Sequence, residues 1–322
     1  MLALPKLSSD VLEELKKSKN LLAFSAGSDS TALFYMLKSL SIEFDIALVN
    51  YQTRKQSLEE EEYAKTIAKE FNKQCYTFTC RLENNNFEHN ARATRYTFFK
   101  QIIQEHSYDT LLTAHHLNDK LEWFLMQLSK GAGAVELSGM SEIEQSNGYK
   151  TIRPLLQVEK SEISEFLHVN KIKHFLDSSN QNKKYFRNKI REEFANSFCE
   201  QFSSGIKKSF EYLEKDKKRL MPELIEQNRK LYILKRDEDN LINIRGIDKI
   251  VKNLGVLLSS SMRDEVLKTK DCIVSSKIAI SFCEDKIYIC PVVDVIMDKK
   301  FKEKCRIEKI PAKIRPYLYS IL

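Results

Sequence analysis

The sequence predicts an α/β fold, a parallel twisted sheet with helices on both faces, followed by a linker helix and a small α+β C-terminal domain. Short apolar runs alternate with amphipathic stretches through the first half of the chain, and this pattern stops near residue 191. Alternation of strands and helices is typical of a parallel sheet. In such folds ligands bind at the carboxyl ends of the strands, so those ends are the first place to look for a site.

Four short apolar runs in the first half predict buried strands. They cover residues 21–24, 46–49, 76–79 and 111–114. The amphipathic stretches between them predict helices over residues 31–40, 58–71 and 87–106.

The last third of the chain has a different pattern. A long, Lys-rich stretch predicts a linker helix over residues 206–219. After it we expect a strand at 231–234, a helix at 247–257 and a hairpin formed by 277–282 and 287–289. A length of 322 residues suits two domains. We place them at 1–204, a catalytic domain, and at 205–322, the linker helix and a basic domain.

Charge is distributed unevenly between these parts. Residues 1–200 contain 26 Lys and Arg against 27 Asp and Glu, whereas residues 201–322 contain 26 against 18. A basic domain beside a nearly neutral one indicates a polyanionic partner such as RNA. The chain has no apolar run long enough to span a membrane and no signal-peptide pattern, so we expect a cytoplasmic protein without a membrane partner.

A small-residue loop follows the first predicted strand and opens the first helix of the alternating pattern. Its residues are Ser25, Ala26, Gly27, Ser28, Asp29 and Ser30. Small side chains let backbone amides and a helix N-terminus face a phosphate, and Asp29 is suited to holding Mg²⁺. Taken alone, the same hexapeptide is explained equally well by a turn in which Ser28 or Asp29 caps the helix.

A histidine and two acidic residues follow the fourth predicted strand. His115 ends the strand, and Asp119 and Glu122 fall one turn apart on a helix that begins near Leu117. Two carboxylates and an imidazole can bind Mg²⁺ or an ammonium substrate and can move a proton. The alternative is a solvated helix start, where the helix dipole favours carboxylates.

The small-residue loop resembles the Ser-Gly-Gly-x-Asp-Ser loop of the PP-loop ATP pyrophosphatases, which are adenine nucleotide α-hydrolase-like proteins that cleave ATP between the α- and β-phosphates. Ala26 stands where these proteins usually have the first glycine, and its methyl fits if φ is negative. Further blocks, in the right order, resemble the tRNA(Ile)-lysidine synthase family. They lie at residues 90–96, 114–122, 130–133, 137–140, 153–156, 177–180 and 185–191.

Several positions depart from that family's pattern. Asn118 replaces a frequent Asp, and Trp123 replaces a common Thr. Residues 49–54 alter the usual Val-Asp-His-x-x-Arg but keep Arg54.

The resemblance implies a two-step reaction that consumes ATP. The enzyme adenylates C2 of the wobble cytidine in a tRNA(Ile) with a CAU anticodon, releasing pyrophosphate. Free L-lysine then displaces AMP to form lysidine, which changes codon reading from AUG to AUA and identity from Met to Ile. The implied cofactors are ATP and Mg²⁺, and a homodimer is a candidate assembly.

The resemblance also assigns roles to residues. Ser25 to Ser30 would hold pyrophosphate, with Asp29 on Mg²⁺, and Asp119 and Glu122 would bind lysine. The catalytic set is Asp29, His115, Asp119, Glu122 and Arg187. The candidates for tRNA binding are Arg92, Arg95, Arg187 and Arg191, because guanidinium groups suit phosphate oxygens, although each taken singly is also explained as a surface arginine.

Aromatic side chains lie among these cations and could stack an extruded base. They are Tyr96, Phe98, Phe99, Tyr185 and Phe186, of which Phe98 and Phe99 have the helical spacing of core residues.

Two other functions stay open. A PP-loop tRNA thiolase would typically carry a C-x-x-C pair, which this sequence lacks. A non-catalytic ATP- or tRNA-binding module is the other, and Ala26 and Asn118 are the residues that favour it.

Overall fold

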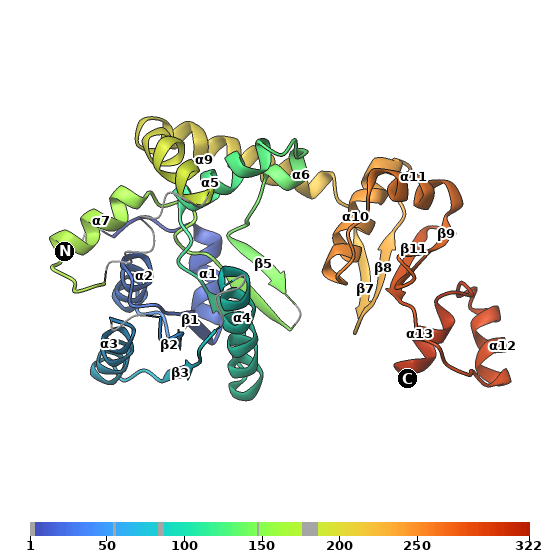
Figure 1. The fold of residues 1–322 in the computed structure, drawn as a ribbon, viewed down its shortest axis with the longest axis horizontal. Helices are drawn as coiled ribbons and strands as arrows, with labels where there is room; N and C mark the ends of the chain where they lie inside the picture. Colours follow the sequence, from blue (N-terminus) through green and yellow to red (C-terminus); the bar gives the residue numbers. More distant parts are fainter. Residues whose placement is uncertain (1–3, 54–55, 83–86, 147, 176–185) are drawn as a thin grey trace. The chain divides into compact units, whose positions relative to one another are not determined.

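The computed structural model describes residues 4–53, 56–82, 87–146, 148–175 and 186–322, and the chain divides into two compact units (Figure 1). The first unit is Met1–Glu214 and the second is Lys215–Leu322. The boundary predicted at 204/205 is therefore too early. Ile206 and Phe210 extend the first unit, because they are buried in one cluster with Leu117 and Leu121. The motif residues 177–180, Tyr185 and Arg54 lie outside the described residues.

Six strands form one sheet in the first unit: β1 (Asn20–Ala23), β2 (Phe44–Asn50), β3 (Cys75–Thr79), β4 (Thr110–Leu112), β5 (Ile143–Ser146) and β6 (Tyr149–Ile152). Their order is β3-β2-β1-β4-β6-β5. The first five in that order are mutually parallel, and β5 runs antiparallel to β6 at the edge. The four predicted strands are confirmed as β1 to β4, and the edge hairpin was not predicted.

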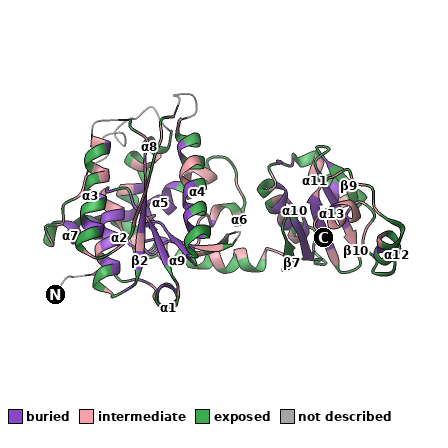
Figure 2. Cartoon of the chain, turned by 90° about the horizontal axis from the view of Figure 1, so that it is seen from below, coloured by how far each residue is buried: buried purple, intermediate pink, exposed green. Residues whose placement is uncertain are grey.

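Helices cover both faces of this sheet: α1 (Ser9–Lys17), α2 (Ser28–Ser39), α3 (Gln56–Glu70), α4 (Phe87–His106) and α7 (Lys160–Val169). Successive strand residues point to opposite faces. Leu22 accordingly belongs to a buried cluster with apolar residues of α1, α2, α3 and α7, whereas Leu21 belongs to a cluster built on α4. Figure 2 shows buried residues gathered along the strands and on the helices beside them. The predicted layers are confirmed.

The strand order reverses at β1. The chain places β2 and β3 on one side of β1 and then returns to place β4 on the other side. At such a reversal the loops that leave the carboxyl ends of the two neighbouring strands diverge and leave a crevice for a ligand. The small-residue loop follows β1, and the histidine segment follows β4. The topology therefore brings the two predicted clusters to one edge of the sheet.

A further helical layer completes the first unit: α5 (Leu117–Leu128), α6 (Ala134–Leu137), α8 (Phe186–Ile190), the π-helical turn η2 (Arg191–Ala195) and α9 (Asn196–Arg219). Ala195 and Cys199 are buried against α5. The predicted linker helix is confirmed as the C-terminal part of α9, which is kinked at Phe202. Short π-helical segments are frequent at functional sites, and η2 begins with Arg191.

The second unit is a small α+β domain, as predicted. Its strands β7 (Leu224–Asn228), β8 (Leu231–Lys235), β9 (Asp271–Val274), β10 (Ile278–Cys283) and β11 (Lys286–Pro291) form an antiparallel sheet in the order β7-β8-β11-β10-β9. The predicted hairpin is confirmed as β10–β11. The helices are α10 (Asn240–Asn253), α11 (Ser260–Thr269), α12 (Lys299–Ile307) and α13 (Arg315–Ser320). In the described part of the chain, no helix has the length and apolar character of a membrane span.

Candidate active site

The loop after β1 is shaped by hydrogen bonds among its own serines. The Ser25 amide donates to Ser30 Oγ at 3.2 Å, the two hydroxyl oxygens are 3.1 Å apart, and Ser30 Oγ donates to the Gly27 carbonyl at 3.2 Å. Ser30 is buried, so its hydroxyl maintains the turn. Gly27 is the N-cap of α2, which leaves the first amides of that helix directed at the crevice. The loop thus combines a rigid turn with a helix N-terminus, as an anion site requires.

Ala26 has a left-handed backbone conformation, with φ of 60°. The negative φ under which its methyl was expected to fit is therefore not adopted. Its carbonyl accepts a hydrogen bond from the Phe175 amide at 3.0 Å, and Gly27 forms an isolated parallel β-bridge with Phe175. These contacts fix the turn from outside the loop and offset the strain of a left-handed alanine. Ala26 is fully buried, so it shapes the loop from within and its neighbours Ser25 and Gly27 line the cavity.

The segment after β4 contains two histidines with different surroundings. His115 Nδ1 lies 2.9 Å from Thr113 Oγ1, and burial lowers the pKa of His115 to about 4. His116 precedes α5, and its Nε2 lies 3.4 Å from Asp119 Oδ2 and 3.8 Å from Asp29 Oδ2. The structure therefore places His116 between the small-residue loop and the acidic pair. His115, the predicted catalytic histidine, lines the same cavity.

Asp119 and Glu122 lie on one face of α5, as predicted, and both carboxylates contact arginines. Arg191 donates from Nη2 to Asp119 Oδ1 at 2.9 Å and from Nε to Glu122 Oε2 at 2.8 Å. Arg187 Nε pairs with Glu122 Oε1, and its Nη2 lies 3.7 Å from Asp119 Oδ1. Arg187 and Arg191 were predicted to bind tRNA phosphates, but in this structure their guanidinium groups are engaged with carboxylates.

This network keeps Asp119 ionised. Burial alone would raise the pKa of Asp119, but the neighbouring histidines His116 and His115, Arg191 and the His116 amide outweigh burial and lower it to about 2. Burial alone would lower the pKa of Arg191, but the carboxylates of Asp119 and Glu122 raise it. At neutral pH the cluster is a set of fixed opposite charges, which is a surface suited to an ammonium group or a phosphate.

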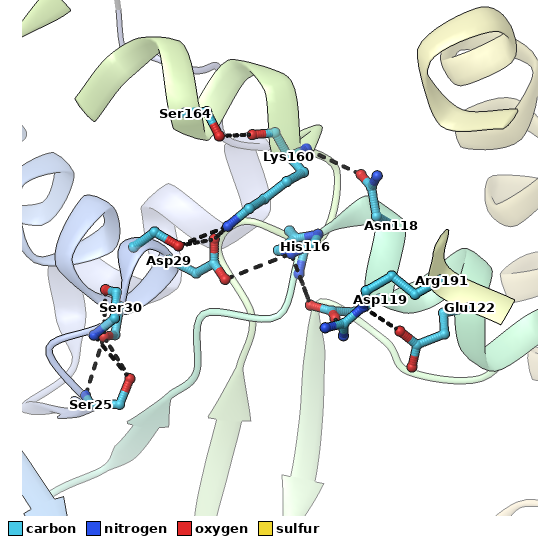
Figure 3. A network of polar contacts seen from close by, with 12 residues as sticks. Ser25, Asp29, Ser30, His116, Asn118, Asp119, Glu122, Lys160, Ser164 and Arg191 are labelled. Carbon is cyan, nitrogen blue, oxygen red and sulfur yellow. Dashed lines mark hydrogen bonds and ion pairs between the residues drawn. The ribbon is translucent and has the colours of Figure 1, made fainter. Parts of the chain in front are cut away.

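Lys160 also reaches the small-residue loop. It is the first residue of α7, and its Nζ donates to Ser28 Oγ at 2.8 Å and pairs with Asp29 Oδ1. Its backbone amide donates to Asn118 Oδ1 at 3.1 Å, and Asn118 Nδ2 donates to Asn196 Oδ1 at 3.0 Å. Asn118 thus connects α5 with α7 and α9. Figure 3 shows Lys160, Asp29, His116, Asp119, Arg191 and Glu122 as one chain of polar contacts.

Most of this chain of contacts opens onto a cavity of about 1620 Å³. Arg92, Arg95 and Tyr96 of α4 line it together with Asp29, His116, Asp119, Lys160 and Arg191. Arg187 and Glu122 are not among its lining residues in the described part of the chain. The volume is ample for a nucleotide of several hundred Å³ together with a second ligand.

The aromatic candidates separate into two groups. Phe98 and Phe99 are buried in the α4 core, as their helical spacing indicated. Tyr96 lines the cavity with Arg92 positioned 4.8 Å from its ring centre, and Phe186 is exposed. Among the predicted aromatic candidates that the structure describes, Tyr96 is therefore the best placed to meet a base.

Comparison with known proteins identifies the family. A PP-loop domain family matches residues 4–198. A tRNA(Ile)-lysidine synthase of Campylobacter jejuni is 45% identical over 98% of this chain and 97% of its own length. The chain belongs to the tRNA(Ile)-lysidine synthase family. Members from Wolinella succinogenes and Helicobacter pylori are 42% and 41% identical, over 95% and 96% of this chain and 94% and 92% of their own.

The fold also resembles that of a solved U34-tRNA thiolase from Methanococcus maripaludis. The TM-score is 0.55 and the identity 16%, over 79% of this chain and 86% of the thiolase. At that identity the likeness concerns the fold. The lysidine synthase family assignment rests on the sequence relatives, which match both units.

For this member of the tRNA(Ile)-lysidine synthase family, sequence reasoning missed two residues of the site. His116 had a usable signal, because a residue followed three positions later by Asp119 at a helix start is a capping-box pattern, and the His116 amide does donate to Asp119 Oδ2 at 3.1 Å. Lys160 had none, because α7 was not predicted and its contact with Asp29 joins residues far apart in the chain.

Proposed function

We propose that this protein ligates free L-lysine to C2 of the wobble cytidine of tRNA(Ile) with a CAU anticodon, using ATP and releasing AMP and pyrophosphate. One observation carries the proposal beyond family membership. His116 joins Asp29 of the small-residue loop to Asp119 of the acidic pair, at 3.8 and 3.4 Å. A loop suited to pyrophosphate and a carboxylate suited to an amine therefore meet at one point, as the two half-reactions require.

In the first half-reaction the C2 oxygen of cytidine attacks the α-phosphorus of ATP. The bond from that phosphorus to the bridging oxygen breaks, and pyrophosphate leaves with the electron pair. The amides at the start of α2 face the leaving group and stabilise its charge. Arg92 and Arg95 line the same cavity and are proposed to contact phosphates of ATP or tRNA. Tyr96 is proposed to stack on the cytidine.

In the second half-reaction the ε-amine of lysine attacks C2, and AMP leaves with the electrons of the C2–O bond. Asp119 and Glu122 are proposed to bind the lysine ammonium before it loses a proton. A carboxylate has several acceptor positions, so an ammonium can share these groups with a guanidinium. Arg187 is 44% exposed and is the arginine of the pair that can turn toward a tRNA phosphate.

The described residues fit a magnesium ion held mainly by substrate phosphates. Asp29 offers one carboxylate at the mouth of the loop, with 32% of its side chain exposed. No group of three or more His, Cys, Asp or Glu side chains placed to hold a metal occurs in the described part of the chain. Mg²⁺ commonly takes one or two carboxylates and completes its shell with water and phosphate oxygens. We propose Asp29 as its protein ligand, and the bound ion would neutralise phosphate charge.

The second unit is proposed to bind the tRNA backbone. Residues 215–322 contain 24 Lys and Arg against 16 Asp and Glu, and neutralising phosphates with such cations releases counterions. The affinity for tRNA should therefore fall steeply as salt rises. A homodimer and a cytoplasmic location stay predictions, which analytical ultracentrifugation and cell fractionation test.

Mass spectrometry of the wobble nucleoside tests the function directly. The enzyme is incubated with ATP, lysine and tRNA(Ile) bearing a CAU anticodon, and pyrophosphate release is measured in parallel. We expect lysidine and one pyrophosphate per modified tRNA. Pyrophosphate release with a different base modification would indicate another PP-loop enzyme, such as a thiolase. Binding of ATP and tRNA without pyrophosphate release would indicate a non-catalytic module.

A further inference from the structure

Lys160 is held at the small-residue loop by its backbone as well as by its side chain. The Lys160 amide donates to Asn118 Oδ1, and this hydrogen bond fixes the first turn of α7 beside α5. Ile163 and Phe166 of α7 are buried in the same core cluster as Leu33 of α2. Because apolar packing already fixes α7 against α2, the position of the Lys160 backbone at the mouth of the loop does not depend on its pairing with Asp29.

The ion pair between Lys160 and Asp29 contributes little to holding the fold together. About a third of each side chain is exposed, 35% for Lys160 and 32% for Asp29. Exposed pairs of this kind stabilise proteins by roughly 0–1 kcal/mol. A stabilising role therefore accounts poorly for a lysine that reaches both Ser28 and Asp29 at the mouth of a cavity.

The charge balance of the loop favours a ligand role. The loop offers neutral amides and one carboxylate, whereas departing pyrophosphate carries several negative charges. Arg187 and Arg191 are engaged with Asp119 and Glu122. Lys160 is a cation in contact with the loop itself, and a lysine ammonium is a compact charge that suits phosphate oxygens.

We propose that Lys160 is a catalytic residue that binds the β-phosphate end of ATP and stabilises the departing pyrophosphate. In the ligand-free chain Asp29 and Ser28 hold its ammonium in place. When the bond to the α-phosphorus breaks, the electron pair passes to the bridging oxygen of pyrophosphate, and the ammonium donates hydrogen bonds to that group without transferring a proton. The proposal rests on the proposed function and adds one residue to its first half-reaction.

Lys160→Met and Lys160→Arg test the proposal, with Lys207→Met as the matched control. Lys207 also lies near the start of α7, where its Nζ is 3.4 Å from Glu159 Oε1 and 3.7 Å from Glu162 Oε2. Lys207 belongs to α9, and Lys207→Met removes one positive charge beside the N-terminus of α7 without changing a contact of the small-residue loop. Thermal melting of each variant shows whether it folds.

The two half-reactions are measured separately. Adenylation is followed by tRNA-dependent exchange of labelled pyrophosphate into ATP, and the second step by lysine transfer to tRNA that wild-type enzyme has already adenylated. We expect Lys160→Met to slow adenylation by about 10²-fold, the usual effect of removing one donor to a developing anion, with lysine transfer unchanged. Lys160→Arg should recover most of the loss, and inorganic pyrophosphate should inhibit Lys160→Met more weakly than wild type.

Three outcomes would overturn the proposal. They are wild-type adenylation by Lys160→Met, an equal loss in both steps, and an equal loss in Lys207→Met. If the wild-type enzyme itself forms no lysidine, the proposed function fails instead, and the two failures are therefore distinguishable.

Discussion

The two units use charged residues in opposite ways. In the first unit Glu122 has 2% of its side chain exposed and meets two guanidinium groups, and Asp119 lies beside it with His116. In the second unit the ion pair between Lys309 and Glu284 leaves 69% and 61% of the two side chains exposed. Buried charges must be paired to be tolerated, and breaking such pairs is costly, whereas exposed pairs matter little. The buried, paired charges of the first unit suit the proposed chemistry, and the exposed charges of the second suit the proposed attraction of a polyanion.

The largest expected effect is that of Asp29→Ala, which should slow adenylation in the first unit and spare tRNA binding. The change removes the proposed magnesium ligand and the acceptor that holds Lys160, so adenylation should fall by at least about 10³-fold, or about 4 kcal/mol of transition-state stabilisation. Binding of tRNA, measured by filter retention, should stay within about twofold, because we propose that the second unit supplies most of it. Retained adenylation would contradict the role of Asp29, and lost tRNA binding would contradict the division between the units.

His115→Gln should remove acid sensitivity from the first unit. The pKa of His115 falls from 6.5 to about 4 in the folded chain because the side chain is buried. As pH falls below 6.5 the unfolded state takes up the proton first, so stability declines until the folded state is protonated near pH 4. Over this pH range the free energy of unfolding should fall by about 3 kcal/mol, at about 1.4 kcal/mol per pH unit. Calorimetry between pH 7 and 4 should show this decline in wild type and a smaller one in the variant. Equal declines would refute the assignment.

Glu122→Gln should weaken both lysine binding and the fold. The substitution leaves Arg191 without one of its carboxylate partners, and because both arginines are partly exposed we expect a loss of about 2 kcal/mol in the free energy of unfolding. The KM for lysine should rise by about tenfold or more.

Glu14→Gln is the matched control for that variant. Glu14 is also largely buried and pairs with two cations, Lys150 and Lys17, but it belongs to α1 and pairs away from the cluster of Asp119 and Arg191. It should lose similar stability and keep the KM for lysine. An unchanged KM in both variants would remove Glu122 from lysine binding.

Neutralising exposed lysines of the second unit should change the salt dependence of tRNA binding more than the rate of the reaction. Lys299, Lys300 and Lys302 of α12 are exposed. Changing all three to Gln should lower tRNA affinity by about tenfold at low salt and reduce the slope of log affinity against log salt by about 0.7–0.9 per lost phosphate contact. Lys6, Lys16 and Lys69 of the first unit are the matched exposed set. Equal effects of the two sets would show that net charge alone, without a basic surface, attracts tRNA.

Local patterns predicted most of the fold. Apolar runs and helical spacing gave β1 to β4, the helices between them and the β10–β11 hairpin, because those signals lie within short windows. The placement of Asp119 and Glu122 on one helix face was predictable for the same reason. The topology then placed both clusters at the β1/β4 reversal, as expected for a parallel sheet.

Contacts between distant segments were not predictable. Lys160 meets Asp29, Arg191 meets Glu122, and Phe175 fixes Ala26, and each pair is joined only through tertiary packing. The contacts of His116 with Asp29 and Asp119 were not predictable either, because the alternation of a strand no longer applies at the end of β4. Composition gave the charge of the second unit but could not place the boundary within α9.

The smallest expected effects are those of glycine substitutions on the free energy of unfolding, and one such substitution can be made in each unit at a left-handed residue. Ala26 of the first unit and Lys270 of the second are both left-handed, with φ of 60° and 56°. Glycine relieves about 1 kcal/mol of strain at either position but makes the unfolded chain more flexible. At Ala26 it also deletes a fully buried methyl worth about 0.8 kcal/mol, whereas Lys270 is exposed at the end of α11.

Ala26→Gly should therefore lower the free energy of unfolding slightly, by less than about 1 kcal/mol, and Lys270→Gly should leave it unchanged or raise it by up to about 0.5 kcal/mol, since glycine is favoured after a helix. Denaturant titration measures both. Adenylation by Ala26→Gly should stay within about twofold of wild type, because the Phe175 amide holds the Ala26 carbonyl and not its methyl. A large gain in activity would show that the alanine strains the loop away from its working shape, and that the contacts from Phe175 do not compensate.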